Sequence, residues 1–198
     1  MKKPIRRKDI PPQRRREILD AAAALFAQSG YHGVTVDAIA QRAGISKGNL
    51  YWYFSSKQEI IHQLFEYLAD PLFTPMQQIL EKDAPPRDKL RDFARGCFDT
   101  AEANPDAVRL LWQIAMQPQL KELISYDYTN WMRPGIDILA PCFADIGDPH
   151  PRDTASFYII TLDALMGSCV IGSEIFDKEK ILAVLEERFI DCRRDHDG

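Results

Sequence analysis

Apolar residues in the N-terminal part of the chain recur with the 3.6-residue period of an α-helix. In the segment 14–30 they form one stripe, made up of Ile18, Leu19, Ala22, Leu25 and Phe26. The pair Ser29-Gly30 follows, and glycine readily takes the backbone conformation that ends a helix. The pattern therefore predicts a helix over residues 14–30.

Two shorter helices are predicted over residues 35–57. Thr35 can cap the first, whose apolar face consists of Val36, Ile39, Ala40 and Ala43. Gly44 then allows the chain to turn, because glycine accepts a positive φ without a Cβ clash, and Ser46 can cap the next helix. One face of that helix holds Leu50, Tyr53 and Phe54. Two short helices about a glycine turn are typical of a helix-turn-helix, which presents its second helix to the major groove of DNA.

The other faces of this second helix carry groups that suit DNA. They hold Lys47, Gly48, Asn49, Tyr51 and Trp52. The lysine and Lys57 supply positive charge, tyrosine hydroxyls suit phosphate oxygens, and Asn49 can read a base edge. An alternative is that the aromatic residues form a packed apolar cluster while the lysines are merely solvated. The preceding helix favours DNA binding, because it completes a small helical unit around the helix-turn-helix.

Over roughly fifty residues this segment resembles the TetR family of transcriptional regulators. The matching positions are Gly30, Thr35, Ala43, Gly44, Ser46, Lys47, Gly48, Leu50, Tyr51, Phe54 and Lys57. The resemblance implies that phosphates are held by Thr35, Tyr51 and Lys57. It implies that bases or sugar edges face Lys47, Gly48, Asn49, Trp52 and Tyr53. Leu50 and Phe54 would hold the helix in place.

Two residues depart from the family pattern. Position 49 is often Thr or Ser in the family, whereas Asn49 has the donor and acceptor pair that suits adenine. Asp37 is acidic where some relatives carry a base-reading Arg, and we interpret it as a group that serves the N-terminus of its helix.

The charge of the chain is divided unevenly. Residues 1–57 hold 11 Lys and Arg against 4 Asp and Glu, a net charge of +7, and the remainder carries −11 within the total of −4. A basic module on an acidic body fits an end that faces a duplex. Residues 1–13 are basic and contain three prolines, so we expect a flexible arm that either tracks DNA or is a solvated tail. No apolar segment of a secretory signal follows its charges.

The rest of the chain reads as helical, because strand-like alternation is nowhere sustained. Predicted helices cover 57–69, which Asp70-Pro71 should break, then 72–82, 87–103 and 105–116. The segment near 121–146 is interrupted by Pro134, Pro141 and Gly147. The fold class is therefore all-α. An N-terminal three-helix helix-turn-helix DNA-binding domain (14–57) is followed by a larger helical ligand-binding and dimerisation domain (58–198).

Residues 153–172 form the most apolar stretch, but its apolar run, 157–172, is too short for a transmembrane span, which needs about 20 apolar residues. Its small residues, Ala164, Gly167, Ser168 and Gly172, allow close helix contact. The last helix carries an apolar stripe of Ile181, Leu182, Val184, Leu185 and Phe189. We predict a homodimer through these two helices, within about 153–192. Such a dimer requires a near-palindromic operator on double-stranded DNA.

Large side chains in the body predict a small-molecule site. The candidates are Phe98, Trp112, Met116, Trp131, Tyr158, Asp163 and Met166. The alternative for each is that it simply fills the core. Asp163 stands out because a carboxylate in an apolar helix needs a partner, and an internal Arg or a dimer contact is favoured over a ligand.

Nothing in the sequence indicates catalysis, a metal site or a cofactor. The four cysteines and four histidines are widely spaced, and without a secretion signal they indicate reduced thiols in the cytoplasm. The leading hypothesis is a DNA-binding regulator, not an enzyme, that represses transcription until a small, largely apolar ligand releases it. The alternative is a DNA-bound adaptor that recruits a protein partner and has no inducer.

Overall fold

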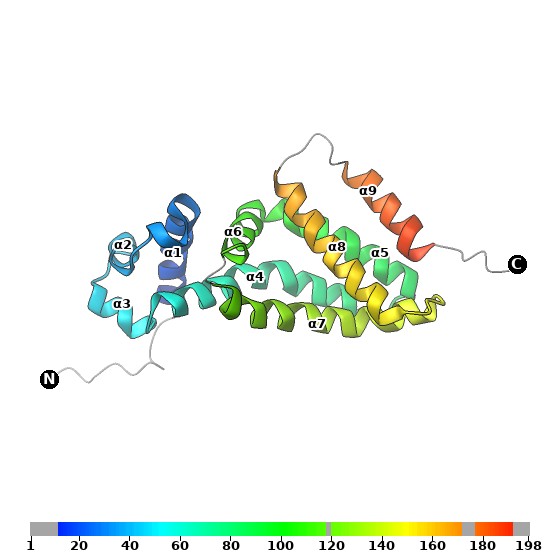
Figure 1. Ribbon diagram of the computed structural model, residues 1–198, viewed down its shortest axis with the longest axis horizontal. Helices are drawn as coiled ribbons and strands as arrows, with labels where there is room; N and C mark the ends of the chain where they lie inside the picture. Colours follow the sequence, from blue (N-terminus) through cyan, green and yellow to red (C-terminus); the bar gives the residue numbers. More distant parts are fainter. Residues whose placement is uncertain (1–11, 118–119, 172–176, 192–198) are drawn as a thin grey trace, which may run out of the picture. The chain divides into compact units, whose positions relative to one another are not determined.

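The computed structural model describes residues 12–117, 120–171 and 177–191, and these residues contain helices but no strand. The elements are α1 (Pro12–Gly33), α2 (Val36–Arg42), α3 (Lys47–Tyr53), α4 (Lys57–Glu81), α5 (Pro86–Ala103), α6 (Pro105–Ala115), α7 (Lys121–Asp145), α8 (Pro151–Ile171) and α9 (Lys178–Leu185) (Figure 1). A π-helical turn, Glu186–Ile190, follows α9. The all-α prediction is confirmed.

The chain divides into two compact units. The first consists of Met1–Ala69 and Leu110–Ile124, and the second of Asp70–Arg109 and Ser125–Gly198. The part of α6 from Leu110 onward therefore belongs with α1 to α3 and the start of α4. This division differs from the contiguous boundary expected after residue 57. Residues 1–11 of the expected N-terminal arm lie outside the described part of the chain.

The first unit is built on the apolar stripe of α1. Ile18, Leu19, Ala22 and Phe26 are buried there. α1 begins at Pro12, two residues before the expected start. Gly30 has φ 64° and ψ 177°, outside the helical region, so the helix bends at the expected stop before the turn that reaches Gly33.

The helix breaks predicted at Pro71, Pro134 and Pro141 are wrong. α4 is continuous through Pro71 and Pro75, although proline removes a backbone hydrogen bond. Its apolar stripe persists past both prolines, since Leu72, Met76 and Leu80 are buried, and this packing offsets the local cost. α7 likewise contains Pro134 and Pro141, and the chain turns only at Gly147, where φ is 88°.

The second unit is centred on the packing of α5 against α8, which lie side by side (Figure 1). Tyr158 of α8 is fully buried, and its hydroxyl donates a hydrogen bond to the Leu90 carbonyl at 2.9 Å. Its ring meets Phe143 at 5.5 Å and Phe189 at 5.0 Å between centroids. These rings join α7, α8 and the π-helical turn into one core.

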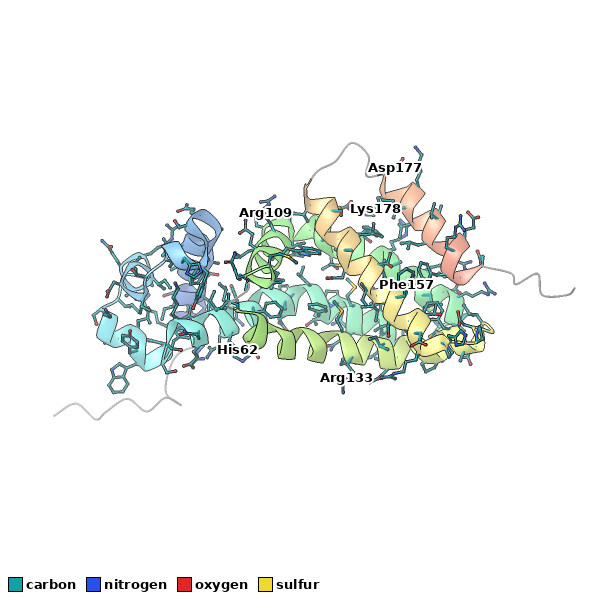
Figure 2. All side chains as sticks on the ribbon, viewed as in Figure 1. His62, Arg109, Arg133, Phe157, Asp177 and Lys178 are labelled. Carbon is teal, nitrogen blue, oxygen red and sulfur yellow. The ribbon has the colours of Figure 1, made fainter. Side chains whose placement is uncertain are left out.

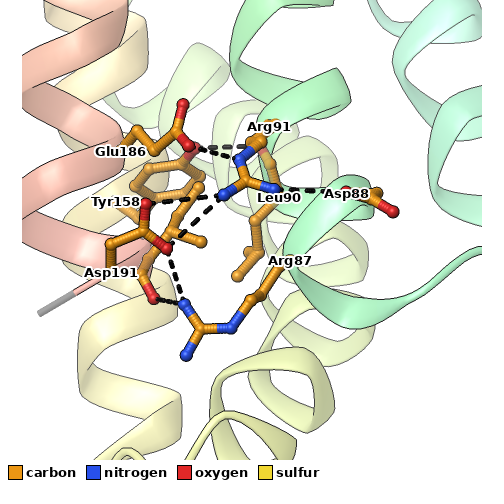
Figure 3. A network of polar contacts seen from close by, with 8 residues as sticks. Arg87, Asp88, Leu90, Arg91, Tyr158, Glu186 and Asp191 are labelled. Carbon is orange, nitrogen blue, oxygen red and sulfur yellow. Dashed lines mark hydrogen bonds and ion pairs between the residues drawn. The ribbon is translucent and has the colours of Figure 1, made fainter. Parts of the chain in front are cut away.

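Ion pairs fasten the C-terminal elements to α5. Arg91 Nε lies 2.6 Å from Glu186 Oε1, and Arg87 lies 2.7 Å from Asp191 Oδ1 (Figure 3). At the other end of α9, Lys178 lies 2.6 Å from Asp99 and within reach of a second α5 carboxylate (Figure 2 labels the lysine). α9 is therefore held at both ends within its own unit.

Candidate nucleic-acid interface

The two helices of the helix-turn-helix are fixed by side-chain caps, as the sequence predicts. Thr35 Oγ1 accepts a hydrogen bond from the Ala38 amide at 3.1 Å, and Ser46 Oγ accepts one from the Asn49 amide at 3.1 Å. Between them Gly44 has φ 64°. A side chain at this φ would be strained, so glycine sets the angle at which α3 leaves α2.

α3 is anchored by its apolar face and by an arginine of α1. Leu50 and Phe54 are fully buried. The Arg15 guanidinium lies 5.3 Å from the centroid of the Phe54 ring, and it donates a hydrogen bond to the Tyr53 carbonyl at 3.3 Å. The predicted anchoring role of the two buried residues is confirmed. Arg15 was missed, because its partners lie far away in the sequence.

The opposite surface of α3 is open to solvent. Lys47, Gly48 and Asn49 are exposed, Tyr51 is 44% exposed and Trp52 is 50% exposed. Tyr53 is half-buried. A short helix with an aromatic pair half in water has an apolar and hydrogen-bonding surface available for a partner. Their individual contacts to bases and phosphates stay predictions.

An ion pair joins the start of α3 to α2. Lys47 Nζ lies 2.8 Å from Asp37 Oδ2, and both side chains are more than half exposed. This hydrogen bond raises the pKa of Lys47, with the Asp37 charge acting in the same direction. Asp37 also stands in the first turn of α2, as expected of a carboxylate that serves a helix N-terminus. The sequence did not reveal its second role.

Lys57 is turned toward α1. Its ammonium donates a hydrogen bond to the Tyr31 carbonyl, and Nζ lies 4.0 Å from the centroid of the Tyr31 ring and 5.9 Å from that of Phe26. Burial lowers the pKa of Lys57. The Lys57 ammonium is thus engaged at Tyr31 in this structure, and its phosphate contact stays a prediction. Thr35 is exposed, with its hydroxyl oxygen serving as the cap of α2.

A family model described as bacterial regulatory proteins, tetR family, matches residues 18–64. This segment covers α1 from residue 18 onward, both helices of the helix-turn-helix and the start of α4. The chain belongs to the TetR family.

Two curated relatives and one solved structure show how far the similarity extends. The transcriptional repressor KstR2 of Mycolicibacterium smegmatis is 38% identical over 120 residues, 61% of this chain and 58% of that protein. The transcriptional activator FasR of the same organism is 36% identical over 101 residues, 51% of this chain and 46% of that protein. The chain thus spans about half the length of these relatives. The regulator FadR from Bacillus subtilis, solved with stearoyl-CoA, has a TM-score of 0.73 at 22% identity and covers 90% of this chain and 99% of its own. At 22% identity this likeness shows that the two proteins share a fold.

The seven residues predicted to bind a ligand are divided between the two units. Phe98 and Tyr158 are fully buried in the second unit, where Asp163 and Met166 are half-buried. The rest belong to other parts of the chain: in the first unit Trp112 is half-buried and Met116 is 65% exposed, while the side chain of Trp131 lies outside the described part.

The polar groups of that prediction have protein neighbours. The Tyr158 hydroxyl is already bonded to the Leu90 carbonyl, so it contributes to the core. The Asp163 charge acts on Cys97, whose pKa is raised mainly by burial and further by this carboxylate. These observations agree with the alternative that such residues fill the core, at least for Phe98 and Tyr158.

The predicted dimer helices expose apolar groups mainly on α8. Phe157 is 64% and Ile160 56% exposed, and Ala164 and Ser168 are exposed further along the same face (Figure 2 labels Phe157). On α9 Val184 is 53% exposed, but Leu182 and Leu185 are buried in their own unit. The stripe of the last helix therefore faces inward over most of its length. Gly172 lies outside the described residues.

The cysteines of the described part are free thiols. Cys97 and Cys142 are buried and Cys169 is half-buried, and burial raises the pKa of each. Cys192 lies outside the described part. Within the same part of the chain there is no group of three or more His, Cys, Asp or Glu side chains suited to a metal ion, and no helix is long and apolar enough to cross a membrane.

Proposed function

We propose that this protein is a sequence-specific DNA-binding transcriptional regulator. The observation that carries the proposal is the exposed surface of α3, made up of Lys47, Gly48, Asn49, Tyr51 and Trp52. Side-chain caps, a glycine turn and buried anchors hold this helix in place. Membership of the TetR family supports it. The +7 charge of residues 1–57 supplies the attraction to phosphates that any duplex-binding module needs.

In the proposed complex α3 lies in the major groove. Lys47, Gly48, Asn49, Trp52 and Tyr53 face bases or sugar edges. Phosphates are held by Thr35, Tyr51 and Lys57, the lysine having left the Tyr31 carbonyl. Asn49 pairs with adenine through its amide donor and acceptor.

A comparison of two alanine variants tests these roles. Asn49→Ala is expected to lose about 1–3 kcal/mol of preference at one base of each half-site. Lys57→Ala is expected to weaken binding to every sequence alike and to flatten the salt dependence by about 0.9 in slope. The operator is first selected from random DNA fragments, and both variants are titrated against it and against random DNA. Equal losses on both DNAs for Asn49→Ala would exclude base reading there, and a salt-independent affinity of the wild-type protein would exclude the function itself.

The regulator is proposed to act as a homodimer through the exposed face of α8, extended by Val184 of α9. Two recognition helices would then lie one helical turn, about 34–36 Å, or a multiple of it apart on a near-palindromic operator. Ile160→Asp places a charge in this face and is expected to yield monomers in sedimentation experiments. Gln77→Asp adds the same charge at an exposed position of α4 and is expected to leave the dimer intact. Dimers that survive Ile160→Asp would rule out this face.

The regulator is further proposed to be a repressor that a small, largely apolar ligand releases from DNA. The named relatives include both a repressor and an activator, and the repressor matches the larger share of this chain. The FadR structure contains stearoyl-CoA, which makes acyl thioesters suitable first probes. A ligand of the folded state raises the melting temperature by mass action. An acyl thioester that binds is expected to raise the melting temperature of the protein. It should also lower the affinity for the operator, and the thioester that raises the melting temperature most should lower this affinity most.

One observation favours the adaptor without an inducer. Phe98 and Tyr158 are fully buried, and the Tyr158 hydroxyl is hydrogen-bonded within the protein. If no compound raises the melting temperature while a specific protein partner remains bound through purification, the adaptor function is supported in place of the inducible repressor.

A further inference from the structure

A pocket of about 260 Å³ lies within the first unit, among α1, α4 and α6. Its lining includes Phe26 and Tyr31 from α1 and Ile61 from α4. Gln113 and Ile114 line it from α6, and Gln117 from the segment just after α6. None of the seven residues predicted to bind a ligand in the body lines it. It is therefore a separate cavity, formed by the same unit that carries the helix-turn-helix.

The lining combines aromatic, aliphatic and carboxamide groups. The rings of Phe26 and Tyr31 stack with centroids 6.1 Å apart and an interplanar angle of 21°. Ile61 and Ile114 contribute aliphatic surface, and the two glutamines contribute groups that can donate or accept hydrogen bonds. Ligand sites are typically apolar with a few polar groups, and pockets for drug-sized ligands have volumes of about 300–1,000 Å³. This pocket suits a smaller, flat molecule with one hydrogen-bonding group.

The bend of α1 gives the pocket its shape. Gly30 lines the pocket and has a positive φ of 64°, which places the chain of Tyr31 outside the regular path of the helix. The Tyr31 ring consequently stacks on Phe26, which lies in the preceding part of α1. Gly30, one of the residues that carry the family resemblance, therefore also places an aromatic wall in the pocket.

Tyr31 connects this pocket to the proposed DNA interface. Lys57 Nζ lies 4.0 Å from the centroid of the Tyr31 ring and is hydrogen-bonded to the Tyr31 carbonyl. A molecule stacked on Tyr31 would fix the residue in this position and keep Lys57 turned inward. In the proposed DNA complex Lys57 moves outward from Tyr31. The pocket's occupant would favour the inward arrangement of this side chain and DNA the outward one, so each would weaken binding of the other.

We infer that this pocket is a ligand site for small one- or two-ring apolar molecules bearing one hydrogen-bonding group, and that its occupant weakens DNA binding through Tyr31 and Lys57. The occupancy of the site is independent of the function proposed above, whereas its effect on DNA rests on that function. The two parts are tested separately.

The first experiment measures binding of 2-naphthol to the full-length protein without DNA, by its fluorescence. Saturable binding is expected, with proton NOEs between the probe and the methyl groups of Ile61 and Ile114. Ala27 also lines the pocket and is exposed on α1, so Ala27→Phe should occupy the space and weaken binding at least tenfold, whereas Ala27→Ser should not. Absent binding, or binding without these NOEs, overturns the site. The NOEs are measured on the wild-type protein and decide the question even if Ala27→Phe does not fold.

The second experiment measures affinity for random DNA against salt, with and without saturating 2-naphthol. Loss of one phosphate contact is expected to reduce the magnitude of the log–log slope by about 0.9. Lys57→Gln should have the reduced slope already and show no further effect of the probe. An unchanged wild-type slope, with the NOEs present, overturns the link to DNA while the site stands. Absence of any DNA binding contradicts the proposed function and leaves the first experiment as the test of the site.

Discussion

Asp37→Asn should make this protein bind random DNA more tightly and select its operator less well. In the structure the Asp37 carboxylate holds Lys47 Nζ at 2.8 Å. Lys47 is the first residue of α3, where the helix dipole disfavours a positive charge, so the carboxylate also compensates this placement. Asparagine keeps the size of the side chain and removes the charge that confines the lysine.

The size of the effect follows from counting phosphates. A freed Lys47 can neutralise one additional phosphate, and each such contact steepens the plot of log affinity against log salt by about 0.9. Between about 50 and 200 mM salt, a fourfold change, the variant should lose affinity about 3.5-fold more than the wild-type protein does. At about 50 mM salt the variant should bind random DNA more tightly than the wild-type protein does. Affinity for the operator should rise less, because a Lys47 that binds a phosphate no longer faces the base or sugar edge that the proposed complex assigns to it.

The assay is a fluorescence-anisotropy titration of operator and random duplexes at several salt concentrations. Glu66→Gln is the matched control, since it removes one negative charge at an exposed position of α4 in the same unit. A general effect of net charge would change both variants equally. If Asp37→Asn steepens the slope no more than the control does, the carboxylate does not confine Lys47 and the argument fails.

Three further predictions concern stability and reactivity. Ser46→Ala removes the cap of the Asn49 amide and should lower the free energy of unfolding by about 1 kcal/mol in urea melts, with Ser46→Asp retaining most of the stability. Tyr158→Phe should cost about 0.5–1.5 kcal/mol, because it deletes a buried hydrogen bond to the Leu90 carbonyl; no loss would mean that water replaces that bond. Cys97, whose thiol pKa is raised by burial, should resist alkylation by iodoacetamide at pH 8 in the native protein and react in urea; rapid native labelling would contradict its burial.

The helix-turn-helix could be predicted from the sequence because the signals that specify it are local. Thr35 and Ser46 each cap a helix through an amide three residues ahead, and Gly44 needs only its own backbone freedom. The buried positions of Leu50 and Phe54 follow from helical periodicity within a few residues. Such short-range patterns remain visible without knowledge of the tertiary structure.

What could not be predicted depends on contacts between distant segments. Local sequence alone predicts a helix break at Pro71, but α4 continues because Leu72 and Met76 are buried beyond it. The inward turn of Lys57 depends on Tyr31, which lies 26 residues earlier, beyond the bend at Gly30. The inclusion of the second part of α6 in the first unit is likewise a tertiary property. No periodicity in a single segment reports which distant partner will cover it.

These distant contacts determine the state in which the module meets DNA. The two lysines that the sequence assigns to DNA are both engaged within the protein, Lys47 by the Asp37 carboxylate and Lys57 by Tyr31. Their engagements differ in kind. An exposed ion pair is weakened by salt, as a phosphate contact is, whereas the half-buried contact of Lys57 with a ring and a carbonyl is screened much less. Raising the salt concentration therefore weakens the competitor of DNA at Lys47 together with the DNA contact itself. At Lys57 a higher salt concentration weakens the phosphate contact but leaves the competing contact with Tyr31 largely intact. Lys57 should therefore be the first of the two lysines to lose its phosphate contact as the ionic strength rises.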